Sequence, residues 1–412
     1  MPDILFNLII FIIITDFVFS YILEYLNYSS WPSKIPETIR DFYSDQKYSE
    51  AFYYNQDKYF LSSVSSTFSY IILLGMLYAG GFYYVDEAAG VISNHPITSA
   101  ILFFIILYAG NEILTLPISY YNTFVIESKY GFNRTKAPLF IKDKIVSFLI
   151  SSVIISAVIS ILIFFYEMLG EKSWIISWII FTVFILLIQY FYTGLIVPLF
   201  NKLTPLEEGQ LKKKIEEYAL KVNFPLDKIF VMDASKRSTK ANAFFSGFGK
   251  RKTIVLHDTL LNNHSDDEIL SVIAHETGHY KKKHIIKMLA FSSATSGIML
   301  YLLFQFLESP HPSTIIGIES KTYHASILVF GILFGPISFI FQTIANKFSR
   351  TYEFEADEYA KLTTDGKTLS NALKKFSIEH LSNLTPHKLY VFFHYSHPPT
   401  IERIYKLEGT NK

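Results

Sequence analysis

Residues 265–307 read SDDEILSVIAHETGHYKKKHIIKMLAFSSATSGIMLYLLFQFL, which joins a polar stretch containing histidines to a long apolar run. Ser265 and Glu268 form a capping-box pattern, so the sequence predicts a helix that begins directly after Ser265. The apolar run Ile286–Leu307 is long enough to cross the hydrocarbon core of a bilayer, which takes about 20 helical residues. The stretch therefore predicts a capped polar helix that leads into a membrane span.

The polar part of this stretch contains the motif His275-Glu276-Thr277-Gly278-His279. Histidines four residues apart lie on one face of a helix, so His275 and His279 can bind the same divalent ion, with Glu276 within reach of the remaining coordination position. This arrangement is typical of zinc hydrolases. The alternative on the motif alone is a pair of surface histidines on an ordinary amphipathic helix.

Six further apolar runs have the length of a membrane span. The composition agrees with many spans, because 50% of the 412 residues are hydrophobic, 17% are aromatic and only 18% are charged. The sequence thus predicts a mainly α-helical polytopic membrane protein with seven transmembrane helices. The other six runs are Ile4–Leu26, Leu61–Val85, Ile97–Tyr121, Ile145–Leu169, Trp174–Phe200 and Ser326–Phe348.

Composition also excludes several functions. The formal net charge is +1, so the chain has no overall basic field with which to hold nucleic acid. Because the chain contains no cysteine, it has no thiol nucleophile, no disulfide and no Cys-ligated metal. Any metal site must be built from His, Asp and Glu.

Lysine and arginine alternate between the loops that join the predicted spans. Loop 27–60 has four and loop 122–144 has five, whereas loop 86–96 has none and loops 170–173 and 308–325 have one each. Short cytoplasmic loops retain such residues, so we expect the N-terminus outside and the rich loops in the cytosol. The long polar segments 201–285 and 349–412 then lie on the cytosolic side.

These runs and segments divide the chain into four parts. We expect spans one to five in 1–200, a metalloprotease segment in 201–285, spans six and seven in 286–348, and a cytosolic segment in 349–412. Segment 201–285 is predicted to contain an amphipathic helix over 205–222 and then the motif helix. Between them the sequence predicts short strands at 228–232, 242–245 and 253–257, the last two joined as a hairpin through Gly247 and Gly249.

A hydrolytic zinc needs a third protein ligand and keeps one position for water. Glu353 follows the seventh run, 74 residues after His279. Asp357 is four residues further on and shares its helical face, so Glu353 can bind the metal while Asp357 orients an imidazole ligand. The alternative is a charged helix next to the membrane whose acidic residues are simply solvated.

Several patches, in order along nearly the whole chain, resemble the integral-membrane CAAX prenyl proteases of the first type. The patches are Tyr130–Arg134, Pro198–Leu206, Ser235–Ser238 with Asn242–Phe245, the His275 motif, Ser349–Asp357 and His394–Arg403. The resemblance implies seven helices around a large water-filled chamber, closed by a small α+β zinc metalloprotease domain of the gluzincin type. It also implies the zinc ligands, which would be His275, His279 and Glu353 around one zinc ion per chain.

The same resemblance implies roles for five further residues. Glu276 would be the general base, and Asp357 would hold a ligand histidine. His397 and Arg403 would bind the substrate carbonyl oxygen as it becomes negative, although His397 beside Pro398-Pro399 could equally be a turn residue. Asn242 would begin a strand that pairs with an extended peptide, and its alternative is an ordinary strand-end residue.

The function implied is a membrane-embedded zinc endopeptidase that removes the C-terminal tripeptide of prenylated CAAX proteins or acts on similar membrane-associated peptides. Its partners would be a peptide or lipidated protein substrate and the lipid bilayer. The alternatives are a quality-control protease resembling the HtpX type and a non-enzymatic metal-binding transporter. Residues 407–412 contain no recognised retrieval signal. The sequence is therefore compatible with location in either a bacterial cytoplasmic membrane or the endoplasmic reticulum membrane.

Overall fold

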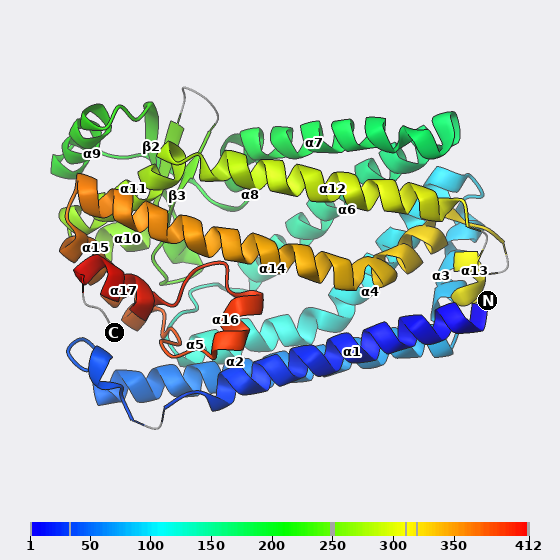
Figure 1. The fold of residues 1–412 in the computed structure, drawn as a ribbon, viewed down its shortest axis with the longest axis horizontal. Coiled ribbons are helices and arrows are strands. Elements are labelled where there is room, and N and C mark those ends of the chain that lie inside the picture. Colours follow the sequence, from blue (N-terminus) through cyan, green and yellow to red (C-terminus); the bar gives the residue numbers. More distant parts are fainter. Residues whose placement is uncertain (1, 33, 248–251, 310, 319, 410–412) are drawn as a thin grey trace.

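The computed structural model describes residues 2–32, 34–247, 252–309, 311–318 and 320–409. Long helices run along the long axis of the molecule, while the strands and the C-terminal helices gather at one end (Figure 1). The N-terminus lies at the opposite end. The chain is thus mainly α-helical, with its small sheet placed at one end of the helical bundle.

Six continuous helical stretches of the described residues are long and apolar enough to cross a membrane. One of them, Ala137–Phe200, contains two of the predicted spans, separated by a short 3-10 turn at Gly170–Ser173. The predicted count of seven spans therefore stays a prediction. The long helices are α1 (Pro2–Ser29), α2 (Asp45–Tyr78), α4 (Pro96–Tyr121), α6 (Ala137–Leu169), α7 (Trp174–Phe191), α12 (His284–Leu307) and α14 (Tyr323–Thr363).

One predicted span overruns its helix. The run 61–85 passes the end of α2 at Tyr78 and enters α3 (Gly81–Ile92). Gly80 between them has φ 67°, a left-handed conformation that glycine adopts at little cost. The apolar pattern missed this break because the residues on both sides are hydrophobic.

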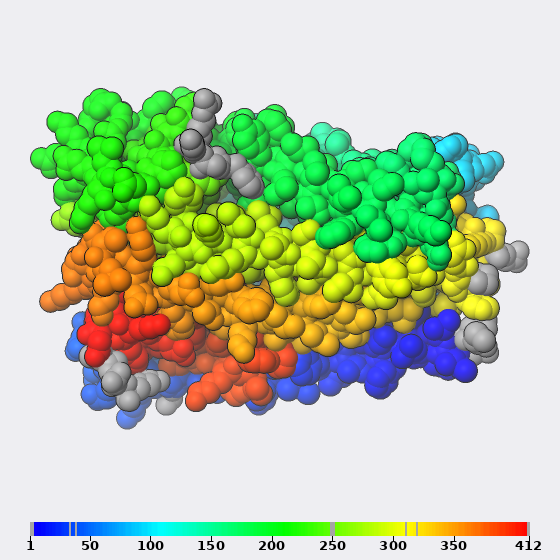
Figure 2. Space-filling model, turned by 45° about the horizontal axis from the view of Figure 1, so that its top comes forward, coloured from blue at the N-terminus to red at the C-terminus, as the bar shows by residue number. Residues whose placement is uncertain are grey.

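Large apolar side chains are exposed on the outer faces of these helices. Examples from four different long helices are Ile71, Ile113, Val153 and Ile340. Figure 2 shows α7, α12 and α14 side by side on one face of the molecule. A protein surrounded by water does not expose apolar surface on this scale, so the pattern agrees with helices that face lipid.

Short elements connect the long helices. The helices that gather with the sheet at one end of the molecule are α9 (Gln210–Lys221), α10 (Asp258–Asn263), α11 (Asp266–Lys281), α15 (Gly366–Glu379) and α17 (Thr400–Glu408). The helix α16 (Lys388–His394) instead packs against α1 and α14. The remaining short helices are η1 (Glu37–Ile39), η2 (Asn122–Ile126), α5 (Glu127–Lys129), η4 (Tyr192–Ile196), α8 (Val197–Phe200), η5 (Ala234–Lys236) and α13 (His311–Ile315).

The sheet has four strands in the order β1-β2-β4-β3. They are β1 (Leu203–Pro205), β2 (Leu226–Met232), β3 (Ala243–Ser246) and β4 (Lys252–His257). β3 and β4 pair antiparallel, which confirms the predicted hairpin, although Gly249 lies outside the described residues. β2 and β4 pair in parallel.

One local expectation was wrong at the start of the polar segment, because α9 begins only at Gln210 rather than at Pro205. One strand was also missed: residues 203–205 form β1, which pairs with β2. A three-residue strand has no periodic pattern of its own, so only its pairing with β2 reveals it. Ile215 of α9, Leu256 of β4 and Ile269 of α11 share one buried core, which fixes the motif helix against the sheet.

Candidate metal and catalytic site

The motif helix α11 begins with the predicted capping box. The Glu268 carboxylate accepts a hydrogen bond from the Ser265 N–H at 2.9 Å, and the Ser265 hydroxyl accepts one from the Glu268 N–H at 3.4 Å. Burial of Ile269 and Ile273 against the sheet fixes the rotation of the helix. The side of α11 that contains His275 and His279 faces Glu353 of α14.

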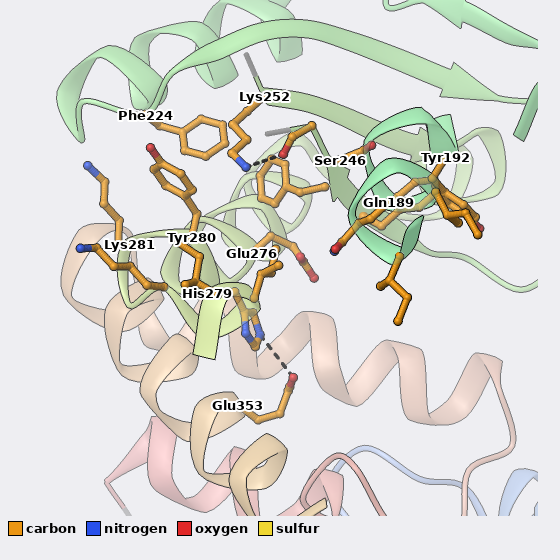
Figure 3. Close-up of a pocket in the computed structure, with 18 of the residues that line it drawn as sticks. Gln189, Tyr192, Phe224, Ser246, Lys252, Glu276, His279, Tyr280, Lys281 and Glu353 are labelled. Carbon is orange, nitrogen blue, oxygen red and sulfur yellow. Dashed lines mark hydrogen bonds and ion pairs between the residues drawn. The ribbon is translucent and has the colours of Figure 1, made fainter. Parts of the chain in front are cut away.

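The structure brings His275 and His279 together with Glu353. One ligand atom from each of the three residues lies within 4.8 Å of the other two. The Nε2 atoms of His275 and His279 are 3.2 Å apart, and the Glu353 oxygens lie 3.3 to 3.4 Å from them. Figure 3 shows His279 and Glu353 facing each other from two helices. The helix α14 extends past its apolar part, and this extension places Glu353 opposite α11.

These three residues fit a divalent metal. Two imidazole nitrogens and one carboxylate oxygen form a donor set that catalytic zinc sites use. Glu353 is only 5% exposed, and its buried Oε2 lies 3.4 Å from His275 Nε2. Burial alone lowers the pKa of His275, but hydrogen bonds to Asp357 and Glu353 raise it to about 9. The site therefore stabilises a positive charge, as a metal-binding site must.

Asp357 contacts His275, one of the two candidate ligand histidines. The His275 Nδ1 atom lies 2.8 Å from Asp357 Oδ1, so the ring donates its second N–H to a carboxylate. Arg403 of α17 donates two hydrogen bonds to the same carboxylate, at 2.7 and 2.8 Å. Its Nη1 atom also lies 3.2 Å from Glu353 Oε2. Arg403 thus holds the two carboxylates together, a role that the sequence pattern did not suggest.

Glu276 follows His275 directly and turns toward the cavity rather than toward the group of three residues (Figure 3). Its carboxylate makes no hydrogen bond or ion pair in the described part of the chain. Burial raises the pKa of Glu276, because the low-dielectric surroundings disfavour the charged form, and the neighbouring histidines partly oppose this shift. A carboxylate of raised pKa beside a metal site is suited to accept a proton from water.

His397 and Asn242 both reach the site. His397 precedes α17, and its Nε2 atom lies 3.3 Å from Glu353 Oε1, while its ring retains 65% of its surface because it faces open cavities. Asn242 directly precedes β3, and its side-chain oxygen accepts a hydrogen bond from the Ala243 N–H at 2.9 Å. β3 is an edge strand of the sheet, so its outer backbone groups have no partner strand within the described residues.

Two cavities meet at Glu276, Glu353 and His397. The larger one, of about 1120 Å³, is lined mainly by apolar side chains from α7, β3 and α12, among them Ile188 and Phe244. The smaller one, of about 330 Å³, lies on the other side of the site, between Asn242 and the helix α15. The site therefore joins a large apolar space to a small mixed one.

The helix α15 also forms part of the site, although no motif in the sequence indicates this. Leu369, Leu373 and Phe376 lie on one face of α15 and line the smaller cavity. Their spacing of three and four residues is a helical pattern that the sequence already contains. That pattern predicts an apolar face, but it gives no information about which neighbour the face meets.

A helical membrane bundle that holds a His-Glu-x-x-His helix opposite a glutamate from a second helix defines the class of membrane metallopeptidases. Comparison of the sequence with known protein families shows which family of metallopeptidases it matches. Residues 24–202 match the family described as CAAX prenyl protease N-terminal, five membrane helices, and residues 205–411 match peptidase family M48. The chain belongs to peptidase family M48.

Individual relatives agree over nearly the full length. The chain is 33% identical to CAAX prenyl protease 1 of Saccharomyces cerevisiae, covering 96% of this chain and 93% of that protein. It is 32% identical to the probable CAAX prenyl protease 1 of Schizosaccharomyces pombe, covering 92% and 82%. The crystal structure of S. mikatae Ste24p superposes with a TM-score of 0.94 at 31% identity, covering 98% of this chain and 99% of that one.

These matches confirm the resemblance to CAAX prenyl proteases that the sequence patches indicate. The chain is a multi-pass membrane protein and a metallopeptidase, and its fold is that of Ste24p.

Proposed function

We propose that this chain is a membrane-embedded zinc endopeptidase that removes the C-terminal tripeptide from prenylated CAAX proteins. One observation carries the proposal: a His-His-Glu metal site with a free carboxylate lies where a large apolar cavity meets a small one. An apolar cavity beside a peptide-cleaving site suits a substrate that has a lipid chain next to the bond to be cut. The names of the relatives point to the same substrate.

In this proposal His275, His279 and Glu353 hold one zinc ion per chain. Zinc, when bound, supplies Lewis acidity toward a peptide carbonyl and toward water. Glu276 accepts a proton from the attacking water and transfers it to the departing amine. His397 donates an N–H to the carbonyl oxygen as negative charge develops there, and Arg403 adds positive charge close by.

The proposed substrate binds along β3. An extended peptide can pair with the free edge of this strand through backbone hydrogen bonds. Asn242 lines the smaller cavity, whereas Phe244, Phe245 and Ser246 line the larger one. A peptide on this edge therefore passes from one cavity to the other beside Glu276. The prenyl chain fits the larger, apolar cavity, where each buried methylene contributes about 0.8 kcal/mol.

We also propose the division of the chain into 1–200, 201–285, 286–348 and 349–412, with the active site on the cytosolic side. The alternation of basic loops supports this orientation. The host membrane is either the endoplasmic reticulum or a bacterial cytoplasmic membrane. Partners are the peptide or lipidated protein substrate and the bilayer.

Two alternatives are less well supported. An HtpX-like quality-control protease would share the metal site, but the match of residues 24–202 to the CAAX prenyl protease membrane region argues against it. A metal-binding transporter has no use for Glu276, which lies beside the ligand group without belonging to it. Peptide cleavage therefore explains more of the site than metal transport does.

The test is a cleavage assay of the purified chain on matched prenylated and unprenylated Cys-aliphatic-aliphatic-X peptides, with and without a chelator. We expect chelator-sensitive release of the terminal tripeptide from the prenylated peptide alone. Glu276→Gln should retain zinc and lose cleavage, because the amide cannot accept the proton. Equal cleavage of both peptides would contradict the prenyl-specific proposal, and cleavage by Glu276→Gln would contradict the role of Glu276.

A further inference from the structure

His279 has a hydrogen-bonded neighbour of its own on the side away from Glu353. The Nδ1 atom of His284 lies 3.1 Å from the Nδ1 atom of His279. On the other side of the His284 ring, Nε2 lies 3.0 Å from the Glu355 carboxylate. A chain of three side chains therefore runs from a proposed metal ligand to a carboxylate near the surface.

The hydrogen positions in this chain follow from the proposed metal site. His279 presents Nε2 to Glu353 and His275, so the metal-binding lone pair is on Nε2 and the ring hydrogen is on Nδ1. That N–H can only donate to His284 Nδ1, which must then be the acceptor. The hydrogen of His284 is consequently on Nε2, where it donates to Glu355. One arrangement of hydrogens satisfies all three groups.

The backbone between the two histidines is built to produce this contact. Residues five apart on a continuous helix point about 140° away from each other, so His284 would face away from His279. Instead α11 ends at Lys281 and α12 begins at His284. Lys283 between them has φ 59° and ψ 32°, a left-handed conformation that is uncommon outside glycine. This break turns the His284 ring back toward His279.

Packing then fixes the His284 ring. His284 is 2% exposed, and its ring stacks on Tyr352 of α14 with centroids 4.3 Å apart and planes 9° apart. Tyr352 is adjacent to Glu353, and Glu355 belongs to the same helix. The helix α14 supplies the proposed ligand Glu353, and it thus also fixes His284, the neighbour of the proposed ligand His279.

We propose that His284 is a positioning residue that fixes the orientation and tautomer of His279 for metal binding, with Glu355 holding the His284 ring in place. The arrangement parallels the Asp357–His275 contact on the other histidine. Such partners of metal-binding histidines typically change metal affinity by about 10- to 100-fold. This inference rests on the proposed zinc site, and it assigns a function to a histidine outside the motif.

Two substitutions separate hydrogen bonding from packing. His284→Phe keeps an aromatic ring against Tyr352 but removes the acceptor for His279. His284→Asn places an oxygen where Nδ1 was, so it keeps the acceptor but loses the stacked ring. We expect the zinc dissociation constant, measured by competition with a chelator, to rise about 10- to 100-fold for His284→Phe and much less for His284→Asn. A residue that only packs would give the opposite order.

The full-length protein in detergent serves for these measurements, and the thermal midpoint of the metal-free form reports folding. If the His284 variants do not fold, Glu355→Ala tests the same chain at a partly exposed position, with Glu358→Ala on the exposed face of α14 as its control. We expect weaker zinc binding only for Glu355→Ala. Zinc binding by His284→Phe equal to that of the unchanged protein, or equal binding by both glutamate variants, would overturn the proposal. Failure of the unchanged protein to bind zinc would instead overturn the zinc site itself.

Discussion

Gly278 of α11 lies directly against the backbone of Ala356 in α14. A Cβ atom added to Gly278 would be 2.9 Å from the Ala356 Cα and 3.1 Å from its carbonyl oxygen. α11 holds His275 and His279, and α14 holds Glu353. The absent side chain at Gly278 therefore sets the distance between the two helices that together form the metal site.

We expect Gly278→Ala to weaken metal binding by separating these helices. The contact is with backbone atoms, which cannot rotate away as a flexible side chain can, so the helices must move. Overpacking of this kind costs about 1–3 kcal/mol of folding stability. The zinc dissociation constant should rise at least about tenfold, as it does when a ligand's supports are lost. Chelator competition on the purified protein measures the zinc affinity, and scanning calorimetry measures the folding stability.

Gly331→Ala is the matched control for this substitution. Gly331 also lies in α14, and an added Cβ would meet no heavy atom within 4 Å outside its own chain neighbours and helix backbone. We expect unchanged zinc affinity and equal or slightly greater stability, because alanine favours a helix more than glycine does. Wild-type zinc affinity in Gly278→Ala would show that the two helices tolerate separation and that the close contact is not needed for the site.

A second prediction concerns the buried carboxylate behind His275. Asp357 is 1% exposed and is bonded to both His275 and Arg403. In Asp357→Asn one oxygen becomes an amide nitrogen, which cannot accept a hydrogen bond from the Arg403 guanidinium. We expect zinc affinity to fall about 10- to 100-fold. Removing one partner of a buried ion pair should also cost about 3–5 kcal/mol of stability.

Glu358→Gln is a suitable control for Asp357→Asn, because Glu358 is the next residue of α14 but lies on its exposed face. It should leave zinc binding and thermal stability unchanged. The measurements are the zinc dissociation constant and the midpoint of thermal unfolding. An Asp357→Asn protein with normal zinc affinity would contradict the assignment of Asp357 as the support of His275.

Much of this site could be predicted from short patterns in the sequence. The Ser265–Glu268 capping box and the spacing of His275 and His279 depend only on helix geometry, so they could be read without a structure. Apolar runs of about 20 residues likewise locate the long helices, because the bilayer fixes their length. Features that depend on one helix alone can therefore be predicted from the sequence.

Features that depend on contacts between elements could not be predicted from the sequence. Strand β1 exists because it pairs with β2, and its three residues have no pattern of their own. The break at Lys283 lies in a run of three lysines, which contains neither glycine nor proline to indicate it. In the sequence Gly278 is only one residue of the His275 motif, and nothing there indicates its contact with Ala356. In each case the determining partner lies in another segment of the chain.

A third prediction concerns the connection between the membrane helices and the sheet region. Arg237 of the loop after η5 donates two hydrogen bonds to Asp143 of α6, both at 2.7 Å, and a third to the Asn201 side chain. Lysine cannot reproduce this fork of donors. We expect Arg237→Lys to shorten the half-life of the protein at elevated temperature, corresponding to a loss of about 1.5–3 kcal/mol, the typical value of a hydrogen bond to a charged group.

Zinc affinity should stay unchanged in Arg237→Lys, because Arg237 contacts none of the proposed ligands. Lys236→Gln provides the control, since Lys236 forms only a partly exposed ion pair with Asp233 at 2.9 Å, and pairs of this kind contribute little. Equal half-lives of the two variants would show that the Arg237 contacts do not hold the two regions together.

The last prediction is that metal removal destabilises the whole protein through Glu353. A metal that binds only the folded state stabilises it by about 2.7 kcal/mol when its free concentration is 100 times the dissociation constant. α11 and α14 pack against each other at the site, so this free energy resists their separation. A chelator should therefore lower the midpoint of thermal unfolding, and added zinc should restore it.

Glu353→Gln should have a low midpoint from the start and show little response to either reagent, because the amide is a poor zinc ligand. Glu276→Gln should respond to the chelator as the unchanged protein does, since Glu276 lies outside the ligand group. If Glu353→Gln responds to chelator and zinc as fully as Glu276→Gln, the third ligand is not Glu353.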